Sequence, residues 1–125
     1  MKLIIIGLAA LLLIPSNTME VRKPDEWQGP KTLEQVTKEY AEEYGISFEL
    51  VSRIIACESN WNPSAYNYKT HDSGLMQINL PLHAKTAKAM SLDLSKVEGN
   101  IKYGLHLIRT NGTRDYKASR RCWDK

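Results

Sequence analysis

The sequence predicts a mainly α-helical fold in one compact domain, and three observations support this prediction. Thr32 followed three residues later by Gln35 is a capping-box pattern, and Ser47 is a second helix cap. Apolar residues recur at spacings of three and four in two later stretches. Hydrophobic residues make up 42% and charged residues 25% of the 125 residues. Such fractions are typical of soluble domains rather than of disordered or membrane-embedded chains.

Residues 1–18 have the layout of a secretory signal peptide, in which Lys2 precedes an unbroken apolar run. The run is shorter than the roughly 20 apolar residues that span a bilayer. We predict cleavage after Thr18, with an uncleaved anchor as the alternative, and a polar linker over residues 19–31. The domain then covers residues 32–125. We expect it to be exported to the periplasm or the extracellular cell wall, with membrane contact only through the signal segment.

Two helices are predicted in the first half of the domain. The first begins after the cap Thr32 and ends near Tyr44, where Gly45 can adopt the left-handed conformation that follows many helices. The second begins after Ser47 and ends near Ser59, because a proline four residues later prevents its extension.

The middle of the chain is less regular. Residues 60–74 are polar and lack a clear period, which predicts a loop with a possible short hairpin. Helix-forming residues over 81–90 predict a third helix. Ser95 and Glu98 then form a capping-box pattern at the start of a fourth helix.

The fourth helix carries a stripe of apolar or small residues, in which Gly104 would allow another backbone to come close. The stripe consists of Val97, Ile101, Gly104 and Ile108. The helix should end near Asn111-Gly112, and Asp115 can cap a last short helix that carries Cys122.

Cys57 and Cys122 are the two cysteines of the chain, and they follow an export signal. An even number of cysteines in an oxidising compartment predicts a disulfide. A metal site is the weaker alternative, because no Cys-x-x-Cys pattern exists and the three histidines lack ligand spacing. We therefore expect no metal.

The charge of the chain gives little support for nucleic-acid binding. Removing residues 1–18 takes away one positive charge, Lys2, and leaves +2 of the formal net charge of +3. Charges of both signs alternate without a long basic run. A polyanionic wall would suit this small excess, but an ordinary solvated surface has the same pattern.

Glu58 is the one charged residue on the apolar stripe of the second helix. The stripe consists of Val51, Ile54, Ile55 and Glu58. Burial on this stripe and the negative end of the helix dipole should both raise the pKa of Glu58. A carboxylic acid that stays protonated near neutral pH can protonate a glycosidic oxygen. The alternative is that Glu58 points to water or pairs with a lysine or arginine.

Two ordered motifs around Glu58 resemble those of a known family. Residues 58–65 read Glu-Ser-Asn-Trp-Asn-Pro-Ser-Ala, and residues 73–79 read Ser-Gly-Leu-Met-Gln-Ile-Asn. This pair is similar to the motifs of soluble lytic transglycosylases, which have a goose-type lysozyme-like fold. Asn100, Ile101 and Gly104 continue the resemblance, which covers roughly residues 32–108.

The resemblance implies a site without metal or organic cofactor. Glu58 is similar to the catalytic glutamate, and Ser73, Met76 and Gln77 are similar to residues that line the glycan groove. Asn100 corresponds to a groove or structural position. Met76 could equally be a core-filling residue.

The resemblance fails at the C-terminus. The family usually carries alanine-tyrosine-asparagine-glycine there, with the tyrosine facing the catalytic glutamate, whereas residues 118–125 read Ala-Ser-Arg-Arg-Cys-Trp-Asp-Lys. Cys122 stands about where that tyrosine would be, and a bond to Cys57 could replace its positioning role. Tyr103 and Tyr116 are alternative sources of a phenol.

The family implies cleavage of the bond between N-acetylmuramic acid and N-acetylglucosamine in peptidoglycan, with formation of a 1,6-anhydro product. We expect the enzyme to act as a monomer on glycan strands. A hydrolytic muramidase that uses Asp72 as a second acid is the closest alternative. A catalytically weak binding or assembly protein is another. A serine hydrolase built on the neighbours His71, Asp72 and Ser73 is disfavoured, because three consecutive residues cannot easily form the relay.

Overall fold

The computed structural model describes residues 29–125. The predicted signal peptide at 1–18 and most of the predicted linker at 19–31 lie outside the described residues. Within the described part of the chain, no helix has both the length and the apolar character needed to cross a membrane.

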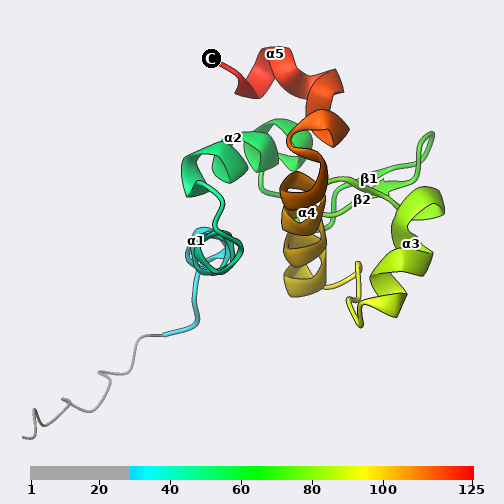
Figure 1. Cartoon of the computed structure of the whole chain (residues 1–125), viewed down its shortest axis with the longest axis horizontal. Helices are drawn as coiled ribbons and strands as arrows, with labels where there is room; N and C mark the ends of the chain where they lie inside the picture. Colours follow the sequence, from blue (N-terminus) through cyan, green and yellow to red (C-terminus); the bar gives the residue numbers. More distant parts are fainter. Residues whose placement is uncertain (1–28) are drawn as a thin grey trace, which may run out of the picture.

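The described domain is mainly helical and includes a small antiparallel sheet (Figure 1). Its helices are α1 (Leu33–Tyr44), α2 (Phe48–Ser59), α3 (Leu80–Ala89), α4 (Val97–Asn111), the 3-10 helix η1 (Arg114–Ser119) and α5 (Arg120–Trp123). Its strands are β1 (Tyr66–Asn67), β2 (Asp72–Ser73) and β3 (Ile78–Asn79), in the order β1-β2-β3. Tyr66 pairs with Ser73, and Asp72 pairs with Asn79.

The ends of α1 and α2 lie where the sequence predicts them. The Thr32 side chain accepts a hydrogen bond from the Gln35 backbone at 3.2 Å, and the Gln35 side chain accepts one from the Thr32 backbone at 2.8 Å. Gly45 follows α1 with φ of 67°. Ser47 caps α2 through the backbone N–H of Leu50. Local side-chain chemistry is therefore sufficient to set these boundaries.

Two predicted caps are wrong. Ser95 does not cap α4, because it lies one residue before the N-cap; its hydroxyl and its backbone N–H both donate to Asp93 Oδ1, at 2.6 and 2.9 Å. The N-cap position of α4 is Lys96, which provides no side-chain bond. Asp115 lies inside η1, and its carboxylate accepts a hydrogen bond from Asn111. The last short helix, α5, does carry Cys122 as predicted.

Helix α4 forms the centre of the core, with α1 and α2 on one side and the sheet and α3 on the other (Figure 1). Ile101 is fully buried and Ile108 nearly so, as the predicted stripe requires. Gly104 faces the Met76 side chain, whose Cε atom would lie 2.6 Å from an added Cβ. The close approach predicted at Gly104 is therefore real, but a side chain rather than a backbone makes it.

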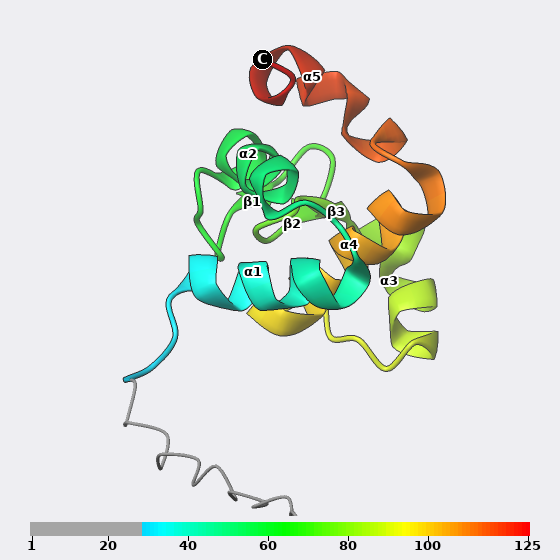
Figure 2. The ribbon, with the colours of Figure 1, turned by 60° about the vertical axis from the view of Figure 1, so that its left-hand side comes forward.

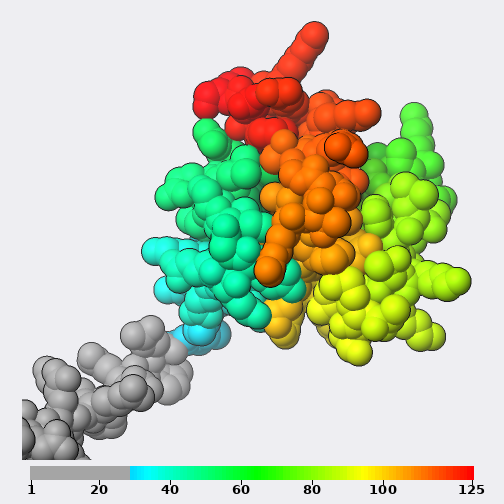
Figure 3. Space-filling model, viewed as in Figure 1, coloured from blue at the N-terminus to red at the C-terminus, as the bar shows by residue number. Residues whose placement is uncertain are grey.

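The C-terminal segment of η1 and α5 lies over α2, at the end of the molecule opposite α1 (Figure 2). In the space-filling view this segment packs directly on the atoms of α2 (Figure 3). Two of its side chains, Tyr116 and Trp123, are buried with 4% and 5% of their surface exposed. The end of the described chain is thereby brought to the end of α2 that carries Glu58.

Candidate active site

Glu58 lies in the last turn of α2, and the chain turns sharply after it. Asn60 and Trp61 both adopt left-handed backbone angles, with φ of 50° and 60°. The Ser59 side chain points back along α2, because its hydroxyl donates to the Ile55 carbonyl at 3.1 Å. The apolar residues of the stripe are fully buried, whereas Glu58 is half-buried at the edge of this core. The predicted placement of a carboxyl at the border of the core is confirmed.

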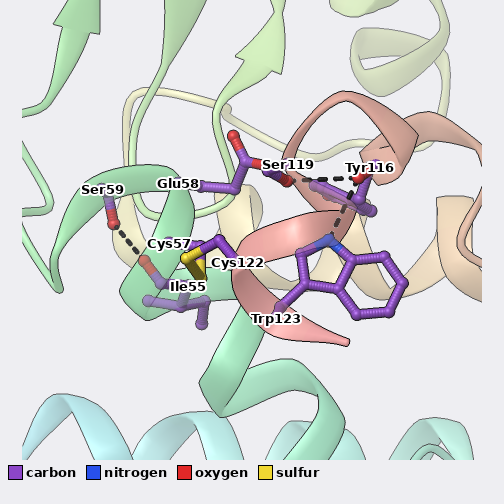
Figure 4. Close-up of a disulfide and its surroundings, with 8 residues drawn as sticks. All are labelled: Ile55, Cys57, Glu58, Ser59, Tyr116, Ser119, Cys122 and Trp123. Atoms are coloured by element: carbon purple, nitrogen blue, oxygen red, sulfur yellow. Dashed lines mark hydrogen bonds between the residues drawn. A yellow bond between two sulfur atoms is a disulfide. The ribbon is translucent and has the colours of Figure 1, made fainter. Parts of the chain in front are cut away.

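Ser119, the last residue of η1, is the hydrogen-bond partner of Glu58. Its hydroxyl contacts Glu58 Oε1, and the second carboxyl oxygen points away from it (Figure 4). This contact was not predicted from the sequence, which gave the positioning role to a bond between Cys122 and Cys57. That bond is present, but the group that contacts the carboxyl is Ser119. No sequence signal marks this contact, because Ser119 lies 61 residues from Glu58.

The surroundings of Glu58 raise its pKa. Burial is the largest cause, because it disfavours the charged form, and the negative charge of Asp72 acts in the same direction. The hydrogen bond from Ser119 opposes both by stabilising the carboxylate. The balance keeps the pKa above its ordinary value, which suits a general acid.

Tyr116 is the second group of η1 beside Glu58. The charge of Glu58 contributes to raising the pKa of its phenol, although burial is the main cause. Its hydroxyl has no hydrogen-bond partner among residues 29–125. The Tyr103 hydroxyl instead pairs with His83 Nδ1 at 3.0 Å. Of the two tyrosines considered from the sequence, Tyr116 is therefore the one whose phenol responds to the charge of Glu58.

The predicted disulfide between Cys57 and Cys122 is present, with a Cα–Cα distance of 6.0 Å. Cys57 directly precedes Glu58, and Cys122 follows Ser119 by three residues. The bond therefore joins the two segments that form the carboxyl–hydroxyl contact (Figure 4).

Gln77 connects the two loops that follow Glu58. Its side-chain amide donates to the carbonyls of Ala65 at 3.2 Å and Gly74 at 3.0 Å, and its backbone is left-handed with φ of 46°. Ser73 lies in β2 and is half-buried, as is Gln77. Both side chains are thus partly accessible, as residues that line a groove must be.

Met76 and Asn100 are in the core, with 0% and 2% of their surface exposed. The Asn100 amide donates to the carbonyls of Ser73 at 2.9 Å and Leu94 at 3.2 Å, and its oxygen accepts from the Met76 backbone at 2.9 Å. The structure therefore favours the packing interpretation of Met76 and the structural one of Asn100. Asn100 thus supports the backbone of the loop between β2 and β3. The packing there is tight, because a Cβ added to Gly74 would lie 2.3 Å from the Asn100 amide nitrogen.

Replacing Asn100 by Ala should destabilise the domain by about 3 kcal/mol, because each buried polar group left without a partner costs roughly 1–3 kcal/mol. Urea unfolding followed by circular dichroism measures this difference. Asn111→Ala is the matched control, since it removes one exposed bond to Asp115 and should cost less than about 1 kcal/mol. Equal losses in the two variants would contradict the supporting role of Asn100.

Comparison with protein families identifies the domain that contains α1 to η1. The family model described as the transglycosylase SLT domain matches residues 35–120. The chain belongs to this family. Its fold is lysozyme-like, and the family acts on peptidoglycan, which implies a location outside the cytoplasm. No significant match was found among curated proteins or among solved structures.

Asp72 is the acidic residue of the SLT domain whose charge acts on Glu58, but both its oxygens have partners, one in β3 and one in the turn between β1 and β2. Oδ1 accepts from Asn79 at 2.9 Å, and Oδ2 accepts from Thr70 at 2.7 Å. His71 pairs with the Tyr66 hydroxyl at 2.7 Å and lies exposed. These bonds assign Asp72 and His71 to the hairpin. No group of three His, Cys, Asp or Glu residues that could hold a metal ion occurs among residues 29–125.

Two cavities of the SLT domain differ in their relation to these residues. The larger, of about 490 Å³, lies between α3 and the segment that follows it and contains none of the predicted site residues. A smaller one, of about 130 Å³, is lined by Gln77, Tyr116 and neighbouring residues. Glu58 and Ser119 line neither cavity, so the smaller one is an indentation beside the site rather than the site itself.

Proposed function

We propose that this SLT domain is a lytic transglycosylase, with Glu58 as its single catalytic acid and base. It would cleave the β-1,4 bond between N-acetylmuramic acid and N-acetylglucosamine in peptidoglycan and release a 1,6-anhydro product. The observation that carries the proposal is the half-buried carboxyl of Glu58, whose pKa is raised and which accepts a hydrogen bond from Ser119.

The proposed reaction uses Glu58 twice. Glu58 first donates its proton to the leaving glycosidic oxygen as the bond from that oxygen to C1 breaks. The N-acetyl group of the substrate stabilises the positive charge at C1. The carboxylate of Glu58 then takes the proton of the C6 hydroxyl, whose oxygen attacks C1 and closes the anhydro ring. Glu58 regains its proton, and no water is consumed.

Hydrolysis on the same fold is the second candidate, and the charge of Asp72 near Glu58 is the observation in its favour. Hydrolysis normally requires a second carboxylate to hold a water or act as a nucleophile. Each Asp72 oxygen accepts a hydrogen bond, from Asn79 or from Thr70, and these bonds tie the carboxylate to the hairpin and β3. This fixed structural role favours the transglycosylase.

Mass spectrometry of the fragments released from purified peptidoglycan tests the proposal. We expect products lighter by one water than the corresponding reducing sugars, formed by the oxidised domain. Reducing ends would instead support the muramidase. An absence of released fragments would support a binding protein.

We further propose that residues 1–18 are removed on export and that residues 19–31 link the signal to the domain. The family's action on peptidoglycan supports an exported form. The intact mass of the exported protein gives the position of the cut. A mass that includes residues 1–18 would support the uncleaved anchor.

A further inference from the structure

The hydroxyl of Ser119 has two acceptors within reach and one proton to donate. It contacts Glu58 Oε1, and it lies 3.1 Å from the backbone carbonyl of Tyr116. The indole N–H of Trp123 already donates to that carbonyl at 3.0 Å (Figure 4). A charge-assisted hydrogen bond to a carboxylate is stronger than one to a neutral carbonyl. The Ser119 hydroxyl should therefore donate its proton to Glu58 rather than to the Tyr116 carbonyl.

We propose that Ser119 is the positioning residue of the catalytic acid. By donating to Oε1 it fixes the plane of the Glu58 carboxyl and leaves Oε2 as the oxygen that exchanges protons with the glycan. The assignment rests on the proposed function, because it concerns the same carboxyl. It places in η1 a hydroxyl that carries out the task for which the family uses a tyrosine.

The bond also matches the step in which charge develops. Glu58 becomes negative as it protonates the leaving oxygen, and a donor already in place stabilises that charge without reorganisation. Asp72 from β2 is the titratable group whose charge acts on Glu58, and the charge of Glu58 in turn acts on the phenol of Tyr116 from η1. Asp72 disfavours the carboxylate, and the buried phenol makes no hydrogen bond to it. Ser119 is consequently the group that supports the charged form.

Two buried side chains and one covalent bond hold Ser119 in place. Tyr116 and Trp123 flank it in sequence, and the Trp123 N–H ties the end of α5 to the backbone of η1. The disulfide at Cys122 then fixes this unit to the residue before Glu58. The hydroxyl therefore has little freedom to move away from the carboxyl.

Ser119→Ala should lower kcat by about 10- to 100-fold with KM nearly unchanged, since misplacing a reacting group by about 1 Å can cost 10²-fold. The high-pH limb of the kcat profile should also move to higher pH. Loss of a bond that stabilises the carboxylate raises the pKa of Glu58, so the protonated acid persists to higher pH. Ser119→Thr keeps the hydroxyl, so its kcat and the position of its high-pH limb should both be close to those of the wild type.

Trp123→Phe is a second, independent variant. It frees the Tyr116 carbonyl to compete for the Ser119 proton, and should shift the limb in the same direction by a smaller amount. Ser52→Ala, on the far part of α2, is the matched control and should change neither quantity. A wild-type rate and pH limb in folded Ser119→Ala would overturn the proposal, as would equal losses in the Ala and Thr variants. If Ser119→Ala does not fold, the other two variants decide. The proposal then requires a wild-type high-pH limb in Ser119→Thr and a limb shifted to higher pH in Trp123→Phe, and an unshifted limb in Trp123→Phe would overturn it.

This test is separable from that of the proposed function. If Glu58→Gln retains activity, the proposed function fails whatever Ser119 does. If Glu58→Gln is inactive and Ser119→Ala behaves as wild type, the catalytic acid stands and the positioning role alone is rejected.

Discussion

Glu58→Gln is expected to reduce the release of peptidoglycan fragments by two to four orders of magnitude, the usual contribution of a general acid–base group. Glutamine has nearly the shape of glutamate and can still receive the Ser119 hydrogen bond through its carbonyl oxygen. It has no acidic proton for the leaving oxygen and cannot take one from the C6 hydroxyl. The rate of fragment release, measured by chromatography of the digested wall, gives the effect directly.

The loss should not come from unfolding. Because burial raises the pKa of Glu58 in the folded domain above its unfolded value, the folded state holds the proton more tightly than the unfolded chain. The resulting stabilisation is present at low pH and is lost as the pH rises through the folded pKa. Glutamine does not ionise, so the variant should be at least as stable as the wild type at neutral pH.

Asp72→Asn and Glu49→Gln are matched controls for this experiment. Asparagine can keep both hairpin bonds of residue 72, with Asn79 and Thr70, so this variant should retain activity within a few-fold. Glu49 is exposed in the first turn of the same helix, and its replacement should have no effect on activity. A loss in Asp72→Asn as large as that in Glu58→Gln would contradict the single-carboxyl mechanism and favour hydrolysis.

The features that the sequence predicted correctly depend on residues that are close in the chain. The caps at Thr32 and Ser47 and the helical stripe that ends at Glu58 involve separations of seven residues or fewer, where side-chain chemistry determines the geometry. The cap at Ser95 failed because α4 begins one residue later, after Lys96, while the Ser95 hydroxyl and backbone N–H donate to Asp93. Both outcomes depend on hydrogen bonds made within a few residues of the helix start.

The remaining parts of the site depend on tertiary structure. Ser119 is 61 residues from Glu58, and no local pattern brings the two together. Met76 is buried against Gly104 of α4, and Asn100 of α4 is buried beneath Gly74, which a motif of groove residues does not reveal. Strand β3 has two residues, too few to produce a period. The identity of the catalytic acid could thus be predicted from sequence, but its partner could not.

Removing the disulfide should cost about 4 kcal/mol of unfolding free energy, because the bond closes a long loop of the unfolded chain. Its cysteines are 65 residues apart. We expect the double variant Cys57→Ser, Cys122→Ser and the reduced wild type to unfold at the same urea concentration, well below that of the oxidised wild type. The double variant, which has no disulfide, should not respond to reductant. A change of less than about 1 kcal/mol on reduction would contradict the prediction.

The same bond should protect activity more than it protects the rest of the fold. Without it, η1 and α5 are held to α2 and α4 by non-covalent contacts alone, and they contribute two residues, Tyr116 and Trp123, to a core that the other elements mainly build. Segments with few buried contacts open at lower cost than the whole domain. Reduced protein should therefore lose activity at urea concentrations below its unfolding midpoint, because Ser119 leaves Glu58 before the helices unfold. The oxidised protein should lose activity and helical structure at the same urea concentration. If the reduced protein also lost the two together, local opening of this segment would be contradicted.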